Sequence, residues 1–176
     1  MVNVEKVLIS ADEIAAKLEE MGKAITADYQ NKDLLIVGVL KGAFIVMADL
    51  ARQIELPVEF DFMAVSSYGA ATQTSGVVRI LKDLDQEIAG RHVLIVEDII
   101  DSGLTLNYLL KSLRVRRPES LEVAALLVKE GIERTPLDVK YTGFTIGPDF
   151  VIGYGLDYAG KFRNLPYIGV MDQSSL

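Results

Sequence analysis

The stretch Val93-Leu94-Ile95-Val96-Glu97-Asp98-Ile99-Ile100-Asp101-Ser102-Gly103-Leu104-Thr105 joins an apolar run to several carboxylates and a turn of small residues. This order predicts a buried strand, then a ligand-binding loop, then the start of a helix. In an open α/β sheet, ligands bind in the crevice outside the carboxyl ends of the strands, so acidic residues at that point are placed for contact with a ligand. The hydroxyls and the glycine suit a phosphate, because backbone amides at a helix N-terminus attract anions.

The same order of strand, loop and helix recurs along the chain. Ser10 and Glu13 fit a capping box in front of an apolar pattern with helical spacing. We expect helices at 11–29, 43–53 and 105–114, and strands at 34–40, 58–65, 77–81, 93–96, 121–128 and 140–146. This alternation predicts an α/β fold with a mostly parallel central sheet and helices on both faces. Residues 66–76 are polar and small and predict a mobile loop, whereas 148–171 are too irregular to extend the main sheet.

Composition bounds the class of protein. A chain of 176 residues with 50% hydrophobic content suits one domain spanning residues 1–176. No apolar run is long enough to cross a membrane, and the N-terminus lacks the regions of a signal peptide. Cysteine is absent, which excludes disulfides and thiol nucleophiles. These features favour a cytoplasmic protein without a membrane partner.

The formal net charge of −7 argues against nucleic-acid binding, which needs cationic residues to displace counterions from phosphates. It also raises a difficulty if the ligand is itself a polyanion. Mg²⁺ resolves the difficulty, because it bridges protein carboxylates to the oxygens of a substrate. The acidic residues and the phosphate loop of 93–105 are therefore compatible.

Other common signatures are missing. The chain has no P-loop motif, and Gly153-Tyr-Gly155 lacks the third glycine of a dinucleotide-binding turn. ATP hydrolysis and hydride transfer are therefore disfavoured. The single histidine, His92, has no second histidine or cysteine to join it in a metal site, so we expect a structural role at the start of a strand.

The whole string from 93 to 105 resembles the phosphoribosyl-diphosphate (PRPP) signature of the type I phosphoribosyltransferases, in the version carried by hypoxanthine-guanine phosphoribosyltransferases. The resemblance implies the type I fold, with a small hood built from the terminal segments. It implies that Glu97 and Asp98 face the ribose hydroxyls and Mg²⁺, and that Asp101 is the general base near the purine N7 proton. The residues matching the cradle for the 5′-phosphate are Ser102, Gly103, Leu104 and Thr105.

Two further segments match the pyrophosphate side of that family. Leu40-Lys41-Gly42 resembles the loop whose backbone amides face the leaving group, and the resemblance implies a cis peptide before Lys41. Arg163, in Phe162-Arg163-Asn164-Leu165-Pro166, matches the pyrophosphate contact, for which a guanidinium fork is well suited.

The purine side is implied by three other segments. Lys129 matches the lysine that donates to the oxygen at position 6 of the purine, and Ser67 and Tyr68 match the start of a flexible loop that closes over the site. The segment 148–158 matches the part that covers the base. Its implied roles are stacking for Phe150, backbone hydrogen bonds for Val151, and the base amino edge or a second Mg²⁺ for Asp157.

The resemblance implies an enzyme of purine salvage, which uses PRPP and Mg²⁺ to convert hypoxanthine or guanine into IMP or GMP plus pyrophosphate. It also implies a homodimer or homotetramer. A receiver-type signalling domain shares the acidic strand ends, but it does not explain the residues from Asp101 to Thr105. A regulator with this fold, which senses PRPP or nucleotide without catalysis, is the alternative. The ranking of hypoxanthine, guanine and xanthine stays open.

Overall fold

A central sheet organises the protein, for which the computed structural model describes residues 4–67, 78–133, 135–172 and 174. Within these residues the sheet has the strand order β4-β3-β2-β5-β6-β7. All neighbouring strands are parallel except β3 and β4, which are antiparallel. The strands are β2 (Leu34–Leu40), β3 (Glu59–Ser67), β4 (Val78–Lys82), β5 (His92–Ile100), β6 (Ser120–Lys129) and β7 (Tyr141–Ile146). The prediction of a mostly parallel sheet is confirmed.

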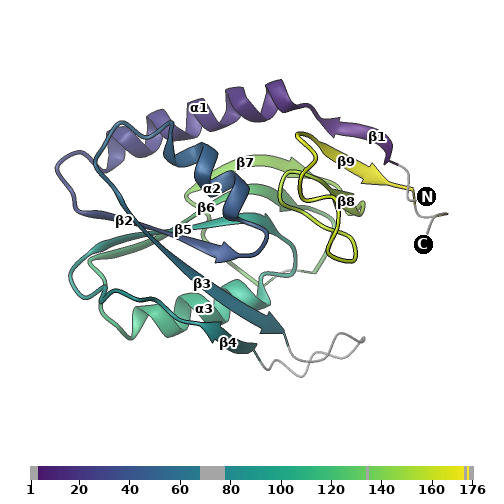
Figure 1. Ribbon diagram of the computed structural model, residues 1–176. Coiled ribbons are helices and arrows are strands. Elements are labelled where there is room, and N and C mark those ends of the chain that lie inside the picture. The colour runs from purple at the N-terminus through teal and green to yellow at the C-terminus, as the bar shows by residue number, and fades with distance from the viewer. Residues whose placement is uncertain (1–3, 68–77, 134, 173, 175–176) are drawn as a thin grey trace.

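Helices cover both faces of this sheet, as the sequence predicts (Figure 1). Helices α1 (Ala11–Asp28) and α2 (Phe44–Ala51) lie on one face, and α3 (Leu104–Arg114) lies on the other. The predicted capping box starts α1. The backbone N–H of Glu13 donates to Ser10 Oγ at 3.2 Å, and that of Ser10 donates to Glu13 Oε2 at 2.7 Å.

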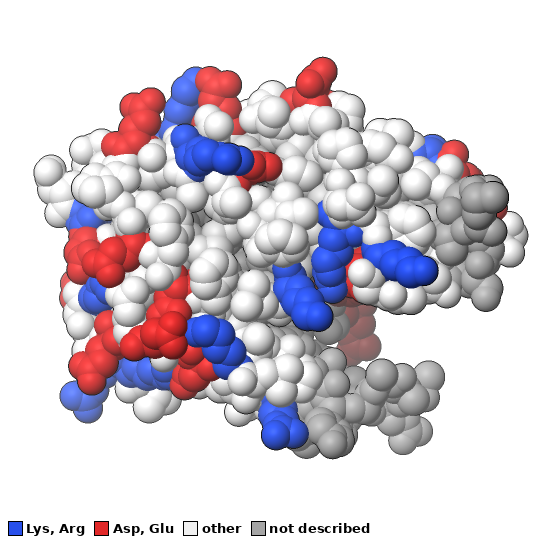
Figure 2. Space-filling view, viewed as in Figure 1, with Lys and Arg blue, Asp and Glu red and all other residues white. Residues whose placement is uncertain are grey.

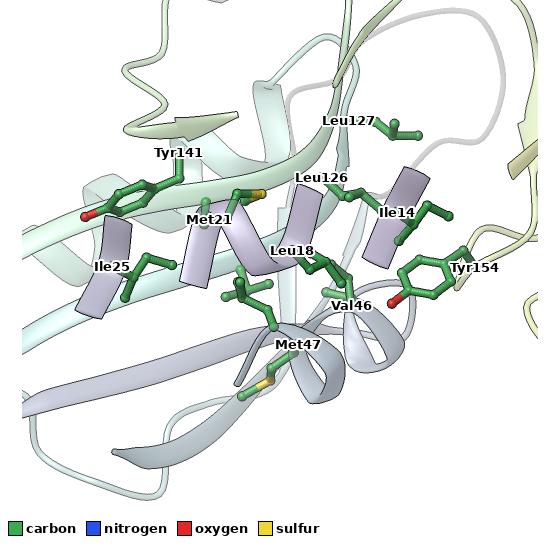
Figure 3. Close-up of a cluster of buried hydrophobic side chains, with 14 of the residues drawn as sticks. Ile14, Leu18, Met21, Ile25, Val46, Met47, Leu126, Leu127, Tyr141 and Tyr154 are labelled. Atoms are coloured by element: carbon green, nitrogen blue, oxygen red, sulfur yellow. The ribbon is translucent and has the colours of Figure 1, made fainter. Parts of the chain in front are cut away.

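Two apolar layers hold the helices against the sheet. Successive residues of β5 alternate between them, so that Leu94 and Val96 join the cluster under α1 and α2, whereas Val93 and Ile95 join the cluster under α3. Figure 3 shows the first cluster, with Ile14, Leu18, Met21 and Ile25 of α1 pointing toward the sheet. Burial on both faces explains why β2 and residues 93–96 of β5 are continuous apolar runs.

The terminal segments form a second, three-stranded sheet, which is the expected hood. Strands β1 (Val4–Ile9), β9 (Ile168–Met171) and β8 (Val151–Ile152) lie in that order and are antiparallel. The tail therefore does not extend the main sheet, as expected. The strand β1 was not predicted, because its short sequence, with Glu5 and Lys6 adjacent, has no alternating pattern and becomes a strand only by pairing with β9, which is far away in the sequence.

Two strand ends differ from the sequence prediction. Strand β5 runs to Ile100 rather than ending at Val96, because Glu97, Ile99 and Ile100 continue to pair with β6. The acidic pair thus lies inside the strand and not after it. Strand β3 includes Ser66 and Ser67, which were predicted to be in the loop, because both pair with β4. Pairing with a neighbouring strand overrides the polar local sequence in both cases. Tyr68 lies outside the described residues.

No helix in the described part of the chain is long and apolar enough to cross a membrane.

The packing of β5 leads to a stability prediction. Leu94 is fully buried at the centre of the sheet, so Leu94→Ala should lower the free energy of unfolding by about 3 kcal/mol through lost burial and a residual cavity. Urea denaturation measures the effect. The matched control is Leu81→Ala on β4, where 61% of the residue is exposed, and an equal loss in both variants would contradict this account of the core.

Candidate active site

The predicted site segments meet at one edge of the main sheet. Strands β2, β5 and β6 are adjacent and parallel, so their carboxyl ends lie side by side. Lys41 follows β2 directly, Glu97 and Asp98 lie near the end of β5, and Lys129 ends β6. This edge faces the hood in Figure 1. The topology therefore brings together residues that are far apart in the sequence, at the position where α/β sheets bind ligands.

A cavity of about 180 Å³ lies at the end of β5. It has the predicted phosphate-binding residues around it. Its lining includes Glu97, Asp101, Ser102, Gly103 and Thr105. Gly103 has a positive φ of 76° and is the residue before α3, so the loop turns there directly into the helix. The first amides of a helix have no intrahelical partner, which leaves them available to an anion. Leu104 is 45% exposed and does not line the cavity.

The acidic pair is electrostatically unfavourable without a cation. Burial raises the pKa of Glu97 well above its usual value, and the nearby charge of Asp98 raises it further. Burial also raises the pKa of Asp98, although the hydrogen bond from the backbone N–H of Ile99 (2.8 Å) and the charge of Arg163 oppose this. Two adjacent desolvated carboxylates of this kind form a donor set that suits a hard divalent cation.

The loop after β2 packs tightly against the acidic pair. The peptide between Leu40 and Lys41 is cis, as the family resemblance implied. A Cβ atom added to Gly42 would lie only 2.0 Å from Asp98 Oδ2. On its other side, a Cβ atom added to Gly155 would lie 2.2 Å from the carbonyl oxygen of Gly42. Gly42 is therefore enclosed between strand β5 and the hood.

Arg163 and Asp157 bind each other within the hood. Arg163 Nη2 lies 2.9 Å from Asp157 Oδ1, and Arg163 Nη1 donates to the carbonyl oxygen of Gly155 at 2.6 Å. The second carboxylate oxygen of Asp157 accepts from the backbone N–H of Gly160 at 2.8 Å. Across the described residues, no three carboxylate, histidine or cysteine side chains gather closely enough to hold a metal ion by themselves. A metal here would need oxygens from a ligand as well.

The predicted purine-binding residues come from both the main sheet and the hood. Lys129 Nζ is 3.6 Å from Asp101 Oδ2, and 11% of the lysine side chain is exposed against 62% of the aspartate. Val151 is buried in β8, where it pairs with Val170 of β9. The neighbouring Phe150 is 39% exposed.

Two contributors were not anticipated from the sequence. Tyr158 meets Phe150 edge to face, with ring centroids 6.1 Å apart. Gly155 allows the hood to approach Gly42. The positive φ of 98° at Gly155 fits its residue type, but only the packing indicates what it approaches. His92 lies at the opposite end of β5, where its Nδ1 is 2.7 Å from Ser120 Oγ, in agreement with a structural role.

The surface charge differs between the two ends of the molecule. Figure 2 shows most carboxylates of this face on the side away from the hood, interspersed with basic side chains, whereas several lysine and arginine side chains lie beside the hollow under the hood, with some carboxylate atoms deeper in it. The overall charge of −7 therefore does not prevent an anionic ligand from approaching this end.

The contacts of Gly42 lead to a testable prediction. The methyl group in Gly42→Ala would collide with the Asp98 carboxylate and displace the loop after β2 or the acidic pair. We expect PRPP affinity to fall by at least about tenfold, because small misplacements of binding groups have large effects. Calorimetric titration with PRPP measures this. Gly147→Ala, where a Cβ atom meets nothing within 4 Å, is the control, and equal affinities in both variants would refute the prediction.

Comparisons with known proteins agree with this geometry. The family model for the phosphoribosyl transferase domain matches residues 8–159. A hypoxanthine-guanine phosphoribosyltransferase of Mycobacterium avium is 52% identical over 176 residues, covering 97% of this chain and 87% of the relative. That of Bacillus subtilis is 50% identical, covering 96% and 94%. A hypoxanthine phosphoribosyltransferase structure from Staphylococcus aureus has a TM-score of 0.94 at 41% identity, covering 98% and 94%. The chain belongs to the phosphoribosyltransferase family.

Proposed function

We propose that this protein transfers the 5-phosphoribosyl group of PRPP to N9 of hypoxanthine or guanine, forming IMP or GMP and pyrophosphate. The observation that carries the proposal is the position of the Asp101 and Lys129 pair. Asp101 lines the phosphate cavity, and it forms an ion pair with Lys129 at the end of β6. A purine bound beside Lys129 would therefore lie next to the phosphoribosyl group. The 50–52% identity to relatives named hypoxanthine-guanine phosphoribosyltransferase supports the same choice of substrates.

In this reaction the bond between C1′ and the pyrophosphate oxygen breaks as the bond between C1′ and purine N9 forms. The proton that the purine loses passes to Asp101, whose carboxylate is largely exposed at the mouth of the cavity. Lys129 donates to the oxygen at position 6, which adenine lacks, and Phe150 stacks on the base. The loop amides after β5 hold the 5′-phosphate, so the chain acts mainly by positioning its substrates.

Mg²⁺ is the cofactor that the acidic pair fits. Glu97 and Asp98 would face it, and the remaining ligands would come from PRPP, since the described residues provide no complete metal site. When bound, Mg²⁺ neutralises charge on the pyrophosphate and ribose oxygens. Arg163 contributes on the same side, because its guanidinium can leave Asp157 for phosphate oxygens.

The direct test is to incubate the protein with PRPP, Mg²⁺ and one purine at a time, and to follow nucleotide formation by chromatography. We expect IMP from hypoxanthine and GMP from guanine, no AMP from adenine, and loss of product when EDTA is added. If the protein converts none of the 6-oxopurines, the proposal fails. PRPP binding without turnover would instead favour a regulator that senses PRPP.

The role of Asp101 predicts a selective loss of turnover. Asp101→Asn removes the proton acceptor but keeps the shape of a side chain that is 62% exposed, so kcat should fall by about 100-fold. PRPP affinity should change much less. Steady-state kinetics and calorimetry measure the two quantities. Asp12→Asn, an exposed position in the first turn of α1, is the control, and a kcat of Asp101→Asn equal to that of the wild type would remove Asp101 from the mechanism.

The role of Lys129 predicts a change in base selection. Lys129→Met keeps the aliphatic stem but removes the donor, so the ratio of kcat/KM for hypoxanthine to that for adenine should fall by about 100-fold or more. Competition assays with both bases measure the ratio. Lys111→Met, on the exposed surface of α3, should leave it unchanged. An unaltered ratio in Lys129→Met would contradict the assignment.

A further inference from the structure

We propose that residues 135–139, the connection that leads into β7, position the phosphate-binding turn, and that Leu137 is the positioning residue. The inference rests on the proposed function and deepens it, since it explains what holds the cradle for the 5′-phosphate in shape. None of these residues lines the phosphate cavity. They act from behind the turn formed by Ser102 and Gly103.

Two contacts join this connection to the turn. The backbone N–H of Thr135 donates to the carbonyl oxygen of Ser102 at 2.9 Å. Leu137 lies against Gly103, because a Cβ atom added to Gly103 would be 2.6 Å from Leu137 Cδ1 and 3.6 Å from the carbonyl oxygen of Thr135. The connection therefore touches both residues of the turn, one through a hydrogen bond and the other through close packing.

The connection is itself anchored to the protein core. Exposure alternates along it, so that Thr135, Leu137 and Val139 are partly buried while Pro136 and Asp138 are exposed. Leu137 and Val139 both pack against the apolar cluster under α3. At its end, the backbone N–H of Lys140 donates to the carbonyl oxygen of Val123 in β6 at 3.0 Å. A segment fixed in this way can hold the turn in place.

The turn needs such support because of its glycine. Gly103 has a left-handed φ of 76°, and glycine has more backbone freedom than any other residue. The amides that bind phosphate follow directly in Leu104 and Thr105, so rotation at Gly103 would turn them away from the ligand. Donors that are already in place bind an anion without the entropic cost of ordering the loop. Leu137 restricts this rotation by filling the space beside Gly103.

The connection also begins near the purine side. Residues 130–134 separate it from Lys129 in the sequence. The backbone N–H of Glu130 donates to the carbonyl oxygen of Ile146 at 2.8 Å. This bond fixes the chain just after Lys129 to the end of β7. A disturbance at Leu137 should therefore affect the phosphate more than the base.

The experiment compares Leu137→Ala with Val139→Ala. Both substitutions remove part of an apolar side chain from the same connection and the same core cluster, but only Leu137 contacts the turn. We expect the KM for PRPP and the Kd for GMP to rise by about tenfold in Leu137→Ala, since the turn loses its preorganisation. The KM for hypoxanthine and the kcat should stay within about twofold of the wild type. In Val139→Ala the affinities should match the wild type.

Two more variants separate positioning from general stability. Leu137→Met fills a similar volume and should restore the PRPP and GMP affinities to within about threefold of the wild type. Leu137→Val is a milder truncation, so its KM for PRPP should lie between those of the wild type and Leu137→Ala. It replaces Leu137→Ala in the comparison if that variant is poorly folded. Thermal melts of all variants show whether the affinities follow stability instead.

The outcomes are distinguishable from failure of the proposed function. A wild-type protein that forms no IMP and binds no GMP would refute the proposed function. An active wild type with equal GMP affinities in Leu137→Ala and Val139→Ala would refute only the positioning role of Leu137. A parallel rise in the KM values for PRPP and hypoxanthine would refute it too, because it would indicate general loosening of the site.

Discussion

The parallel pairing of β5 with β2 on one side and β6 on the other is the constraint on which the site depends. Because parallel strands end at the same edge of a sheet, this pairing brings the loop after β2, the acidic pair of β5 and Lys129 of β6 together. The pairing is stabilised by burial on both faces, where the alternating side chains of β5 contribute to two separate apolar clusters. The apolar packing at the centre of the sheet thus fixes the positions of the site residues at its edge.

Close approach between backbones then gives the site its shape. Gly42 lies between the Asp98 carboxylate and Gly155, and no side chain would fit at either contact. Through this packing the hood, which is a separate sheet made from both terminal segments, is held against the loop at the end of β2. The same principle applies behind the phosphate cavity, where Leu137 takes the place of a Cβ atom on Gly103. At Gly42, Gly155 and Gly103 the missing side chain leaves room for a neighbouring residue to approach the backbone closely.

Electrostatics explain how an acidic protein binds anions. The carboxylates of the site do not stand unopposed, because Asp157 pairs with Arg163 and Asp101 lies 3.6 Å from the Lys129 ammonium. The exception is the acidic pair: burial raises the pKa of both carboxyls, and a neighbouring carboxylate raises each further, Asp98 for Glu97 and Asp157 for Asp98. A divalent cation is a counterion that suits this pair, and under the proposed function PRPP would supply further oxygens to it. Asp101 and Asp157 thus face an opposite charge within the protein, and the proposed cation would supply one to the acidic pair.

The sequence by itself determined the strands and helices of the main sheet and the capping of α1, and the resemblance of residues 93–105 to a PRPP signature indicated the family. These features are encoded locally, in hydrophobic period, cap residues and a short motif. Only the tertiary structure decided that Glu97, Asp98 and Ser67 lie within strands, that residues 4–9 pair with β9, and that Tyr158, Gly155 and Leu137 support the site. Such contacts join residues distant in the chain, so they depend on strand register and packing, which no local pattern specifies.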